Sequence, residues 1–565
     1  MIERLERLYD KEDSKSALEK IKKLEERYKA LIKSSPYEMS EKDVILITYG
    51  DQVVKPSEEP LVTLKHFLDQ YIKGIINTVH ILPFYPYSSD DGFSVIDYKD
   101  VSPRMGSWKD IESLRENYRL MFDGVINHIS QYSFWFKSFL ANDEKYANFF
   151  TEVDPSVDLS QVVRPRTLPL VHEFEDEELK TRYIWTTFSK DQVDLNFANY
   201  KVLIAVLDAL LFYIQKGATL IRLDAIAFVW KEIGTNCIHL PQTHELIQLM
   251  REVIHKIAPE VIIITETNVP HDENISYFGS GEDEAQMVYN FALPPLVAHS
   301  ILKADCKAMT KWASSLRLPS DKVCFFNFTA SHDGCGVRPV SGLISDEALN
   351  DLVQSVENHG GFVSYRSTND NQKTPYELNA SYIDIISNPN EDRRIRVKKM
   401  MLCQAVSLAM PGVPGVYFHS LVGSVSDVEG VKRTGVLRSI NREKLNYDIL
   451  TEALSEVGDL REMIYQNFKH FLSIRKCEKA FNPYSEFSFL DLDDSLFCIR
   501  RVSPDKKEEI LAIHNFADSA LIFMLPDFVS DGAYDLIKNE KIVDKTIEIE
   551  PYQVIWIKQT KEKND

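Results

Sequence analysis

Three carboxylates each follow an apolar, strand-like segment of this chain. Asp224 closes the segment IRLD, Glu266 follows IIIT, and Asp333 ends FTASHD. Such β-branched and aromatic runs are typical of buried parallel strands, and acids at the carboxyl ends of parallel strands meet at one face of a barrel. Two carboxylates with a third acidic helper are the groups that cleave a glycosidic bond. We therefore predict a single pocket that holds all three.

Neighbouring residues suggest a different role for each acid. Arg222 lies two residues before Asp224 and points to the same side of the strand, so we expect it to lower the pKa of Asp224, as suits a nucleophile. Glu266 has no such arginine, and a roofed pocket would raise its pKa, as suits a general acid/base. His332 and Asp333 can bind sugar hydroxyls and steady positive charge. Each acid also has a purely structural alternative. Asp224 could form a buried ion pair with Arg222, Glu266 could be a buried acid capped by neighbouring hydroxyls, and Asp333 could cap a loop.

The surrounding pattern predicts the scaffold. Strand-like and helix-like segments alternate from residue 44 onward, which indicates the α/β class and a (β/α)₈ TIM barrel. The eight expected strands span residues 44–50, 76–84, 119–128, 219–226, 261–268, 287–294, 323–333 and 412–420.

Long gaps and changes of pattern predict further domains. We expect a helical lead over 1–40, the barrel over 41–129 and 201–480, an inserted domain over 130–200, a polar, loop-rich insertion over 335–395, and an antiparallel β domain over 485–565. The lead either packs on the main domain or forms a dimer through its helix. Both insertions follow barrel strands, so both can roof the pocket.

Composition excludes several classes of partner. The 565 residues carry a net charge of -20, which disfavours a nucleic-acid partner, and no apolar run is long enough to span a membrane. The charged N-terminus is untypical of a signal peptide. The seven cysteines form no C-x-x-C pair, and the odd number disfavours a disulfide framework, so we expect free thiols and a cytoplasmic location. No metal site is expected, because no two histidines have the spacing of metal ligands.

Four motifs together resemble the signature regions of the α-amylase family, glycoside hydrolase family 13. They are DGVINH, IRLDAI, TETN and FTASHD, in this order. The resemblance implies that Asp224 is the nucleophile, Glu266 the general acid/base and Asp333 the transition-state stabiliser. It implies further glucose-binding residues: Arg222, His128, His332, Asp91 for the distal hydroxyls, and Arg442, with Arg438 as an alternative to Arg442. It implies no cofactor. Asn127 is interpreted as a structural hydrogen-bonding residue.

Longer segments resemble the sucrose-phosphorylase branch of that family. They include HILPFYPYSSDDGF, WTTFSKDQVDLNFAN and MPGVPGVYFHSLVG, whereas GTNCIHLPQTHELIQLMREVI is most similar to the glucosylglycerate phosphorylases. The resemblance implies a retaining reaction in which a covalent glucosyl-enzyme is attacked by phosphate, giving α-glucose 1-phosphate and glycerate. Sucrose and sucrose 6-phosphate phosphorylases remain alternatives, followed by a water-using α-glucosidase and a catalytically inactive interaction protein.

Phosphate must compete with water, so the acceptor site needs cations and hydrogen-bond donors. The candidates are Arg164, Arg166, Arg366, Lys373 and Tyr376. A glycerate carboxylate would use the same groups, so these residues do not choose between acceptors. The expected partners are thus a small glucoside and inorganic phosphate, and a homodimer stays open.

Overall fold

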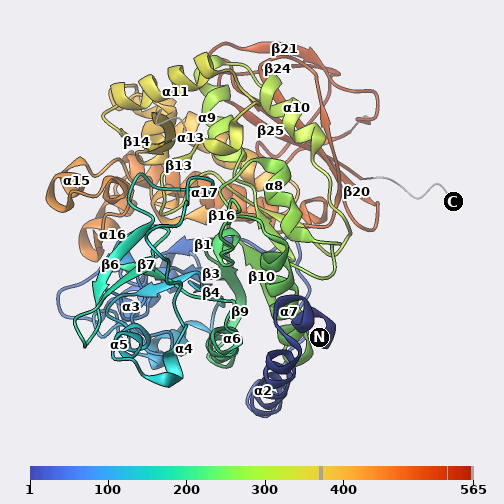
Figure 1. Cartoon of the computed structure of the whole chain (residues 1–565). Coiled ribbons are helices and arrows are strands. Elements are labelled where there is room, and N and C mark those ends of the chain that lie inside the picture. The colour runs from blue at the N-terminus through green and yellow to red at the C-terminus, as the bar shows by residue number, and fades with distance from the viewer. Residues whose placement is uncertain (368–372, 531, 561–565) are drawn as a thin grey trace.

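Eight parallel strands close into a barrel at the centre of the molecule (Figure 1). The computed structural model describes residues 1–367, 373–530 and 532–560. The barrel confirms the predicted fold class. Seven of its strands fall within the predicted segments, and the fourth begins one residue before its segment, at Ala218. In chain order the strands are β1 (Ile45–Thr48), β3 (Thr78–Ile81), β4 (Arg119–Gly124), β9 (Ala218–Leu223), β10 (Ile262–Thr265), β11 (Met287–Tyr289), β12 (Cys324–Phe328) and β16 (Val413–Tyr417).

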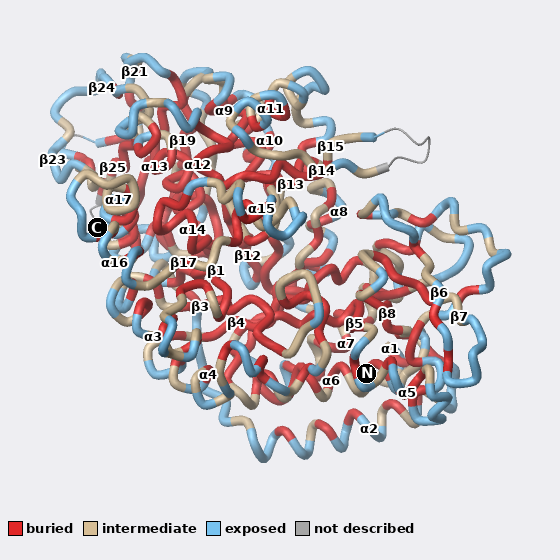
Figure 2. Tube along the Cα trace, turned by 90° about the vertical axis from the view of Figure 1, so that its left-hand side faces the viewer, coloured by how far each residue is buried: buried red, intermediate tan, exposed pale blue. Residues whose placement is uncertain are grey.

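The barrel strands are buried along almost their whole length (Figure 2). Burial on both faces explains why these segments are continuously apolar and do not alternate. The structure differs from the expectation in the third barrel strand, predicted over residues 119–128. β4 ends at Gly124, and β5 (His128–Ser130) pairs instead with β8 (Gln192–Asp194) in the antiparallel sense. The chain therefore leaves the barrel before His128.

Helices between the strands cover the outside of the barrel. Asn199 caps α6 (Tyr200–Gln215) by accepting a hydrogen bond from the backbone N–H of Lys201, and α7 (Pro241–Ile257) begins with proline at its first turn. Both helices bury an apolar stripe against the barrel. None of the helices in the described part of the chain has the length and apolar character needed to cross a membrane.

The segment between β4 and α6 forms its own small structure beside the barrel mouth. It contains the β5–β8 pair, the hairpin of β6 (Val171–Glu175) and β7 (Thr181–Trp185), and α5 (Phe134–Leu140). It contributes His128, Arg166 and Gln192 to the wall of the pocket that contains Asp224 and Glu266.

The insertion that follows β12 is more regular than expected. We predicted a loop-rich segment over 335–395, but its described residues include α11 (Asp346–Asn358) and a sheet of β13 (Cys335–Gly336), β14 (Phe362–Ser367) and β15 (Lys373–Asn379). β14 and β15 pair in the antiparallel sense, so hydrogen bonds between strands supply order that the polar sequence did not reveal.

The N-terminal lead forms two helices, α1 (Ile2–Leu8) and α2 (Lys11–Lys29). The break falls at Asp10, whose carboxylate caps α2 by accepting from the backbone N–H groups of Glu12 and Asp13. α2 packs on α6 and α7, and its residues alternate between buried and exposed along its length (Figure 2). This placement matches a lead that packs on the main domain.

The C-terminal part is an antiparallel sheet, drawn in red in Figure 1. Its strands β18 (Glu486–Leu490), β19 (Leu496–Val502), β20 (Glu508–Asn515) and β25 (Val554–Thr560) pair in that order and continue into two shorter strands. The buried Arg501 guanidinium joins this sheet to the barrel, because it donates to the carbonyl oxygens of Ala409 and Met410 at 2.8 Å each. These carbonyls lie at the end of α13 (Arg393–Ala409) and just beyond it.

Candidate active site

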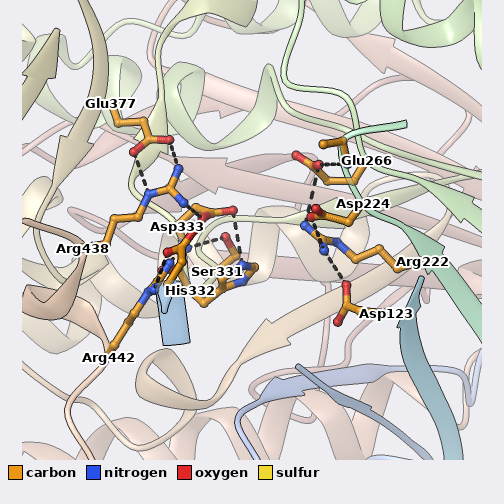
Figure 3. A network of polar contacts seen from close by, with 12 residues as sticks. Asp123, Arg222, Asp224, Glu266, Ser331, His332, Asp333, Glu377, Arg438 and Arg442 are labelled. Carbon is orange, nitrogen blue, oxygen red and sulfur yellow. Dashed lines mark hydrogen bonds and ion pairs between the residues drawn. The ribbon is translucent and has the colours of Figure 1, made fainter. Parts of the chain in front are cut away.

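Asp224 begins the turn that follows β9. Ala225 has a left-handed backbone with φ 48°, which bends the chain sharply away from the strand direction. The carboxylate is buried, and Arg222 donates to its Oδ1 at 2.8 Å. The structure therefore confirms that Arg222 and Asp224 point to the same side of the strand (Figure 3).

Arg222 is held from behind by a second carboxylate. Its guanidinium also pairs with Asp123 on β4, and Asp123 lies 2.7 Å from the Nε2 atom of His80 on β3. These groups are almost completely buried. These contacts restrict the Arg222 side chain to one conformation, so its positive charge has a fixed position beside the pocket.

The effect of Arg222 on Asp224 has the expected direction, but it does not decide the net pKa. Burial raises the pKa of Asp224 to about 7, and Arg222, which lowers it as expected, offsets only part of the rise. The nearby carboxylates of Asp123 and Asp333 raise it further. The spacing in the sequence identifies the arginine next to Asp224. It does not show how far the pocket excludes water, which is what raises the pKa.

Glu266 follows β10 and lies across the turn from Asp224. The backbone N–H of Ala225 donates to its Oε2 at 3.0 Å, while the closest Arg222 nitrogen is 3.8 Å away. Burial raises the pKa of Glu266 to about 7, Arg222 opposes this rise, and the charge of Asp224 adds to it. Because Arg222 donates directly to Asp224 and only weakly reaches Glu266, a single proton shared by the pair is favoured on Glu266.

Asp333 faces this pair from the loop after β12 (Figure 3). Two arginines from a later segment hold it: Arg438 lies 2.5 Å and Arg442 3.6 Å from its Oδ1. Burial raises the pKa of Asp333, but Arg438, His332 and Arg442 outweigh burial and hold the pKa well below its ordinary value. Asp333 is therefore a permanent negative charge opposite the two proton-sharing acids.

All three acids line the same pocket, as the sequence predicted. The arrangement contains a proton donor, an adjacent carboxylate that can attack, and a fixed anion that can stabilise positive charge. These are the elements of acid-assisted displacement at an acetal carbon.

Of the two neighbouring aspartates, the one that lines the pocket differs from the sequence expectation by one position. Asp90, not Asp91, lines the pocket, where its Oδ1 lies 3.4 Å from Arg442. Asp91 pairs with Lys444 at 3.2 Å. Both aspartates have left-handed backbones, with φ 51° and 50°, and this double turn reverses which of the two side chains faces inward. The motif DDGF offered no local signal to choose between them.

Histidines expected at the site lie there, together with a glutamine that we had not singled out. His128 and His332 both line the pocket. The Nε2 atom of His128 lies 2.9 Å from the carbonyl oxygen of Phe93 and 3.2 Å from Nε2 of Gln192. Gln192 also lines the pocket, and its place in the segment DQVDLNFAN was the only hint in the sequence.

Both candidate arginines of the later segment contact the site. Arg442 donates from Nε to the carbonyl oxygen of His332 at 2.7 Å and so supports the loop that carries Asp333. Arg438 lines the pocket and forms a second ion pair with the buried Glu377 at 2.5 Å. Both arginines thus lie next to Asp333, and the choice between them for closing the glucose subsite stays a prediction. Glu377 was not predicted, because it lies inside a strand of the insertion.

The five acceptor candidates separate into two groups. Arg166 and Tyr376 line the pocket, and the Arg166 guanidinium lies 5.9 Å from the centre of the Tyr376 ring. The side chains of Arg164, Arg366 and Lys373 do not line it. Arg164 is exposed and donates to the carbonyl oxygen of Leu168, and Lys373 is exposed at the start of β15.

Comparisons with known proteins agree with this geometry. The alpha amylase catalytic domain model matches residues 67–342. A glucosylglycerate phosphorylase from Spirochaeta thermophila is 45% identical over 92% of this chain and 90% of its own length. Another from Escherichia coli is 42% identical over 92% of both chains. The crystal structure of sucrose 6F-phosphate phosphorylase from Thermoanaerobacter thermosaccharolyticum shares the fold, with a TM-score of 0.75 and 23% identity over 90% of this chain and 98% of that one.

Fold and site therefore define a barrel enzyme of the carbohydrate-active type, with a carboxylate pair in a pocket at the ends of its strands. The chain belongs to the α-amylase family, glycoside hydrolase family 13. Within it, the chain belongs with the glucosylglycerate phosphorylases to which it is similar over nearly its whole length.

Proposed function

We propose that this protein is a retaining phosphorylase that converts glucosylglycerate and phosphate into α-D-glucose 1-phosphate and D-glycerate. The observation that carries the proposal is the position of Arg166. This cation extends from the inserted domain into the pocket that contains Asp224 and Glu266, and within the described residues it forms no ion pair. An unpaired arginine at the mouth of a carboxylate pocket is suited to bind an incoming anion. The similarity to glucosylglycerate phosphorylases supports the donor.

In the proposed first step, Glu266 gives its proton to the glycosidic oxygen while Asp224 attacks the anomeric carbon. Glycerate leaves, and a β-glucosyl ester forms on Asp224. The raised pKa of Glu266, about 7, keeps this proton available near neutral pH. Asp333, whose arginine partners keep it ionised, stabilises positive charge on the ring carbon and oxygen in the transition state.

In the second step phosphate takes the place that glycerate vacated. Glu266, now a carboxylate, accepts a proton from phosphate as a phosphate oxygen attacks the anomeric carbon of the glucosyl ester. The bond between this carbon and the Asp224 oxygen breaks, and Asp224 is released as a carboxylate. Two inversions give net retention. Arg166 orients phosphate, and Tyr376 supplies a hydroxyl beside it. The same pair can bind the carboxylate of glycerate in the first step, so one cationic site serves both anions in turn.

For the donor subsite we propose Asp90, His128 and His332 as ligands of the glucosyl hydroxyls, with Arg222 and Arg442 as the cations that orient Asp224, Asp333 and Asp90. We also infer a cytoplasmic location, supported by the seven cysteines, all of them free thiols and six of them buried.

The test is a parallel assay of glucosylglycerate and sucrose, each with and without phosphate, that follows release of glucose 1-phosphate. We expect phosphate-dependent release from glucosylglycerate and little from sucrose. The opposite preference would keep the mechanism but reject the donor. Glucose release without phosphate at an equal rate would indicate a hydrolase and would reject the phosphorylase assignment.

A further inference from the structure

A buried lysine ammonium lies where the inserted domain meets the barrel. Lys231 follows the short helix η3 (Ile226–Phe228) in the loop after β9, and its side chain is only 5% exposed. Its Nζ atom lies 2.8 Å from Oδ2 of Asp194 and 2.9 Å from Oδ1 of Asn127. Asp194 ends β8 of the inserted domain, and Asn127 directly precedes β5. One side chain thus joins three segments that are far apart in sequence.

The carboxylate at this junction depends on its cation. Asp194 has a completely buried side chain, and over the described chain its ion pair is with Lys231. Its other partners are neutral donors: the backbone N–H of Thr187 at 2.8 Å, the Thr187 hydroxyl at 2.6 Å and Asn127 Nδ2 at 3.1 Å. A buried carboxylate without a counter-charge is strongly disfavoured. Removal of the ammonium would therefore leave a buried carboxylate without a counter-charge and destabilise this junction.

The junction lies next to a pocket residue. Asp194 is the register partner of His128 in the β5–β8 pair, and Nδ2 of Asn127 lies 3.3 Å from Nδ1 of His128. The opposite ring nitrogen of His128 points to Phe93 and Gln192, which line the pocket with it. A shift of Asp194 or Asn127 would displace the His128 ring and its neighbours.

The same loop contacts the inserted domain a second time. The carbonyl oxygen of Asn236 accepts a hydrogen bond from the backbone N–H of Val163 at 3.0 Å. Cys237 is buried in a small apolar cluster with Val162 and other residues of the inserted domain. Val163 lies three residues before Arg166. The loop from Lys231 to Cys237 therefore supports both the His128 side and the Arg166 side of the pocket.

We propose that Lys231 is a positioning residue: its ammonium locks the inserted domain onto the barrel and thereby fixes His128 for the glucosyl donor and the Arg166 segment for the anionic acceptor. The inference rests on the proposed function, because donor and acceptor are those of the phosphorylase reaction. Lys231 does not line the pocket and takes no part in bond making.

The test compares Lys231→Met, which removes the ammonium and keeps an unbranched apolar side chain, with the charge-neutral double variant Lys231→Met/Asp194→Asn and the exposed control Lys15→Met on α2. KM for donor and for phosphate, kcat and the thermal midpoint are measured for each. We expect Lys231→Met to raise both KM values about tenfold or more, with a smaller change in kcat. We expect the double variant to recover the thermal midpoint but not the KM values, since no ammonium bridges the segments.

Two results would overturn the inference. One is a folded Lys231→Met with both KM values within twofold of wild type. The other is a double variant whose KM values recover together with its thermal midpoint, which would show that Lys231 only neutralises Asp194. If Lys231→Met does not fold, the double variant alone carries the test. A wild type that releases glucose 1-phosphate from sucrose but not from glucosylglycerate would contradict the proposed donor alone, and the same KM values would then be compared with sucrose and phosphate.

Discussion

The substitution Glu266→Gln should stabilise the protein, and the gain should grow with pH. Burial raises the pKa of Glu266 from an ordinary value of 4.5 to about 7, so between these values the folded protein binds a proton that the unfolded chain releases. Stability contributed by this group is present below pH 4.5 and is lost as pH rises through 7. Glutamine keeps the shape of protonated glutamate but cannot ionise.

The size of the effect follows from the shift. A pKa difference of one corresponds to about 1.4 kcal/mol, so the rise from 4.5 to about 7 costs the wild type at most roughly 3–4 kcal/mol above pH 8. Because Glu266 titrates together with Asp224, only part of this free-energy cost belongs to Glu266. We expect Glu266→Gln to match the wild type at pH 4.5 and to exceed its free energy of unfolding by about 1–3 kcal/mol at pH 8.

The assay is urea unfolding of wild type and variant at pH 4.5, 6, 7 and 8. Glu19→Gln, an exposed position on α2, serves as the matched control. The difference in free energy of unfolding between this variant and the wild type should not change with pH. A difference between wild type and Glu266→Gln that is constant with pH, or that falls as pH rises, would refute the assignment of a raised pKa to this carboxyl.

Further predictions concern activity. Asp224→Ala should abolish turnover and leave the fold intact, as measured by glucose 1-phosphate release and circular dichroism. The wild-type kcat/KM for the donor should fall above about pH 7, as the raised pKa of Glu266 requires, and a flat profile to pH 9 would contradict its role as acid. Arg166→Met should raise KM for phosphate about 10–100-fold, the loss expected for one charge-assisted contact, and should increase glucose release by water. Asp90→Asn should raise KM for the donor at least about tenfold, whereas Asp91→Asn should change it less than about threefold, because only Asp90 lines the pocket.

The sequence by itself determined the barrel and the three acids that line its pocket. Strands that are buried on both faces must be apolar throughout, and an acid at the end of such a strand, or a few residues beyond it as Asp333 is, indicates a functional pocket, so Asp224, Glu266 and Asp333 could be found from local pattern alone. The arginine two residues before Asp224 followed from the strand period. These signals depend only on residues that are close in sequence, so they can be recognised without knowledge of the fold.

Only the tertiary structure decided the rest. Asp90 lines the pocket in place of the expected Asp91, at a point where two left-handed residues turn the chain. Of the neighbouring arginines, Arg166 lines the pocket and Arg164 does not. The net pKa of Asp224 depends on water excluded by segments from all over the chain, which no neighbour in sequence reports. The contact of Lys231 with Asp194 joins the loop after β9 to β8 of the inserted domain. Such properties depend on contacts between segments that are far apart in the sequence, and these contacts exist only in the folded protein.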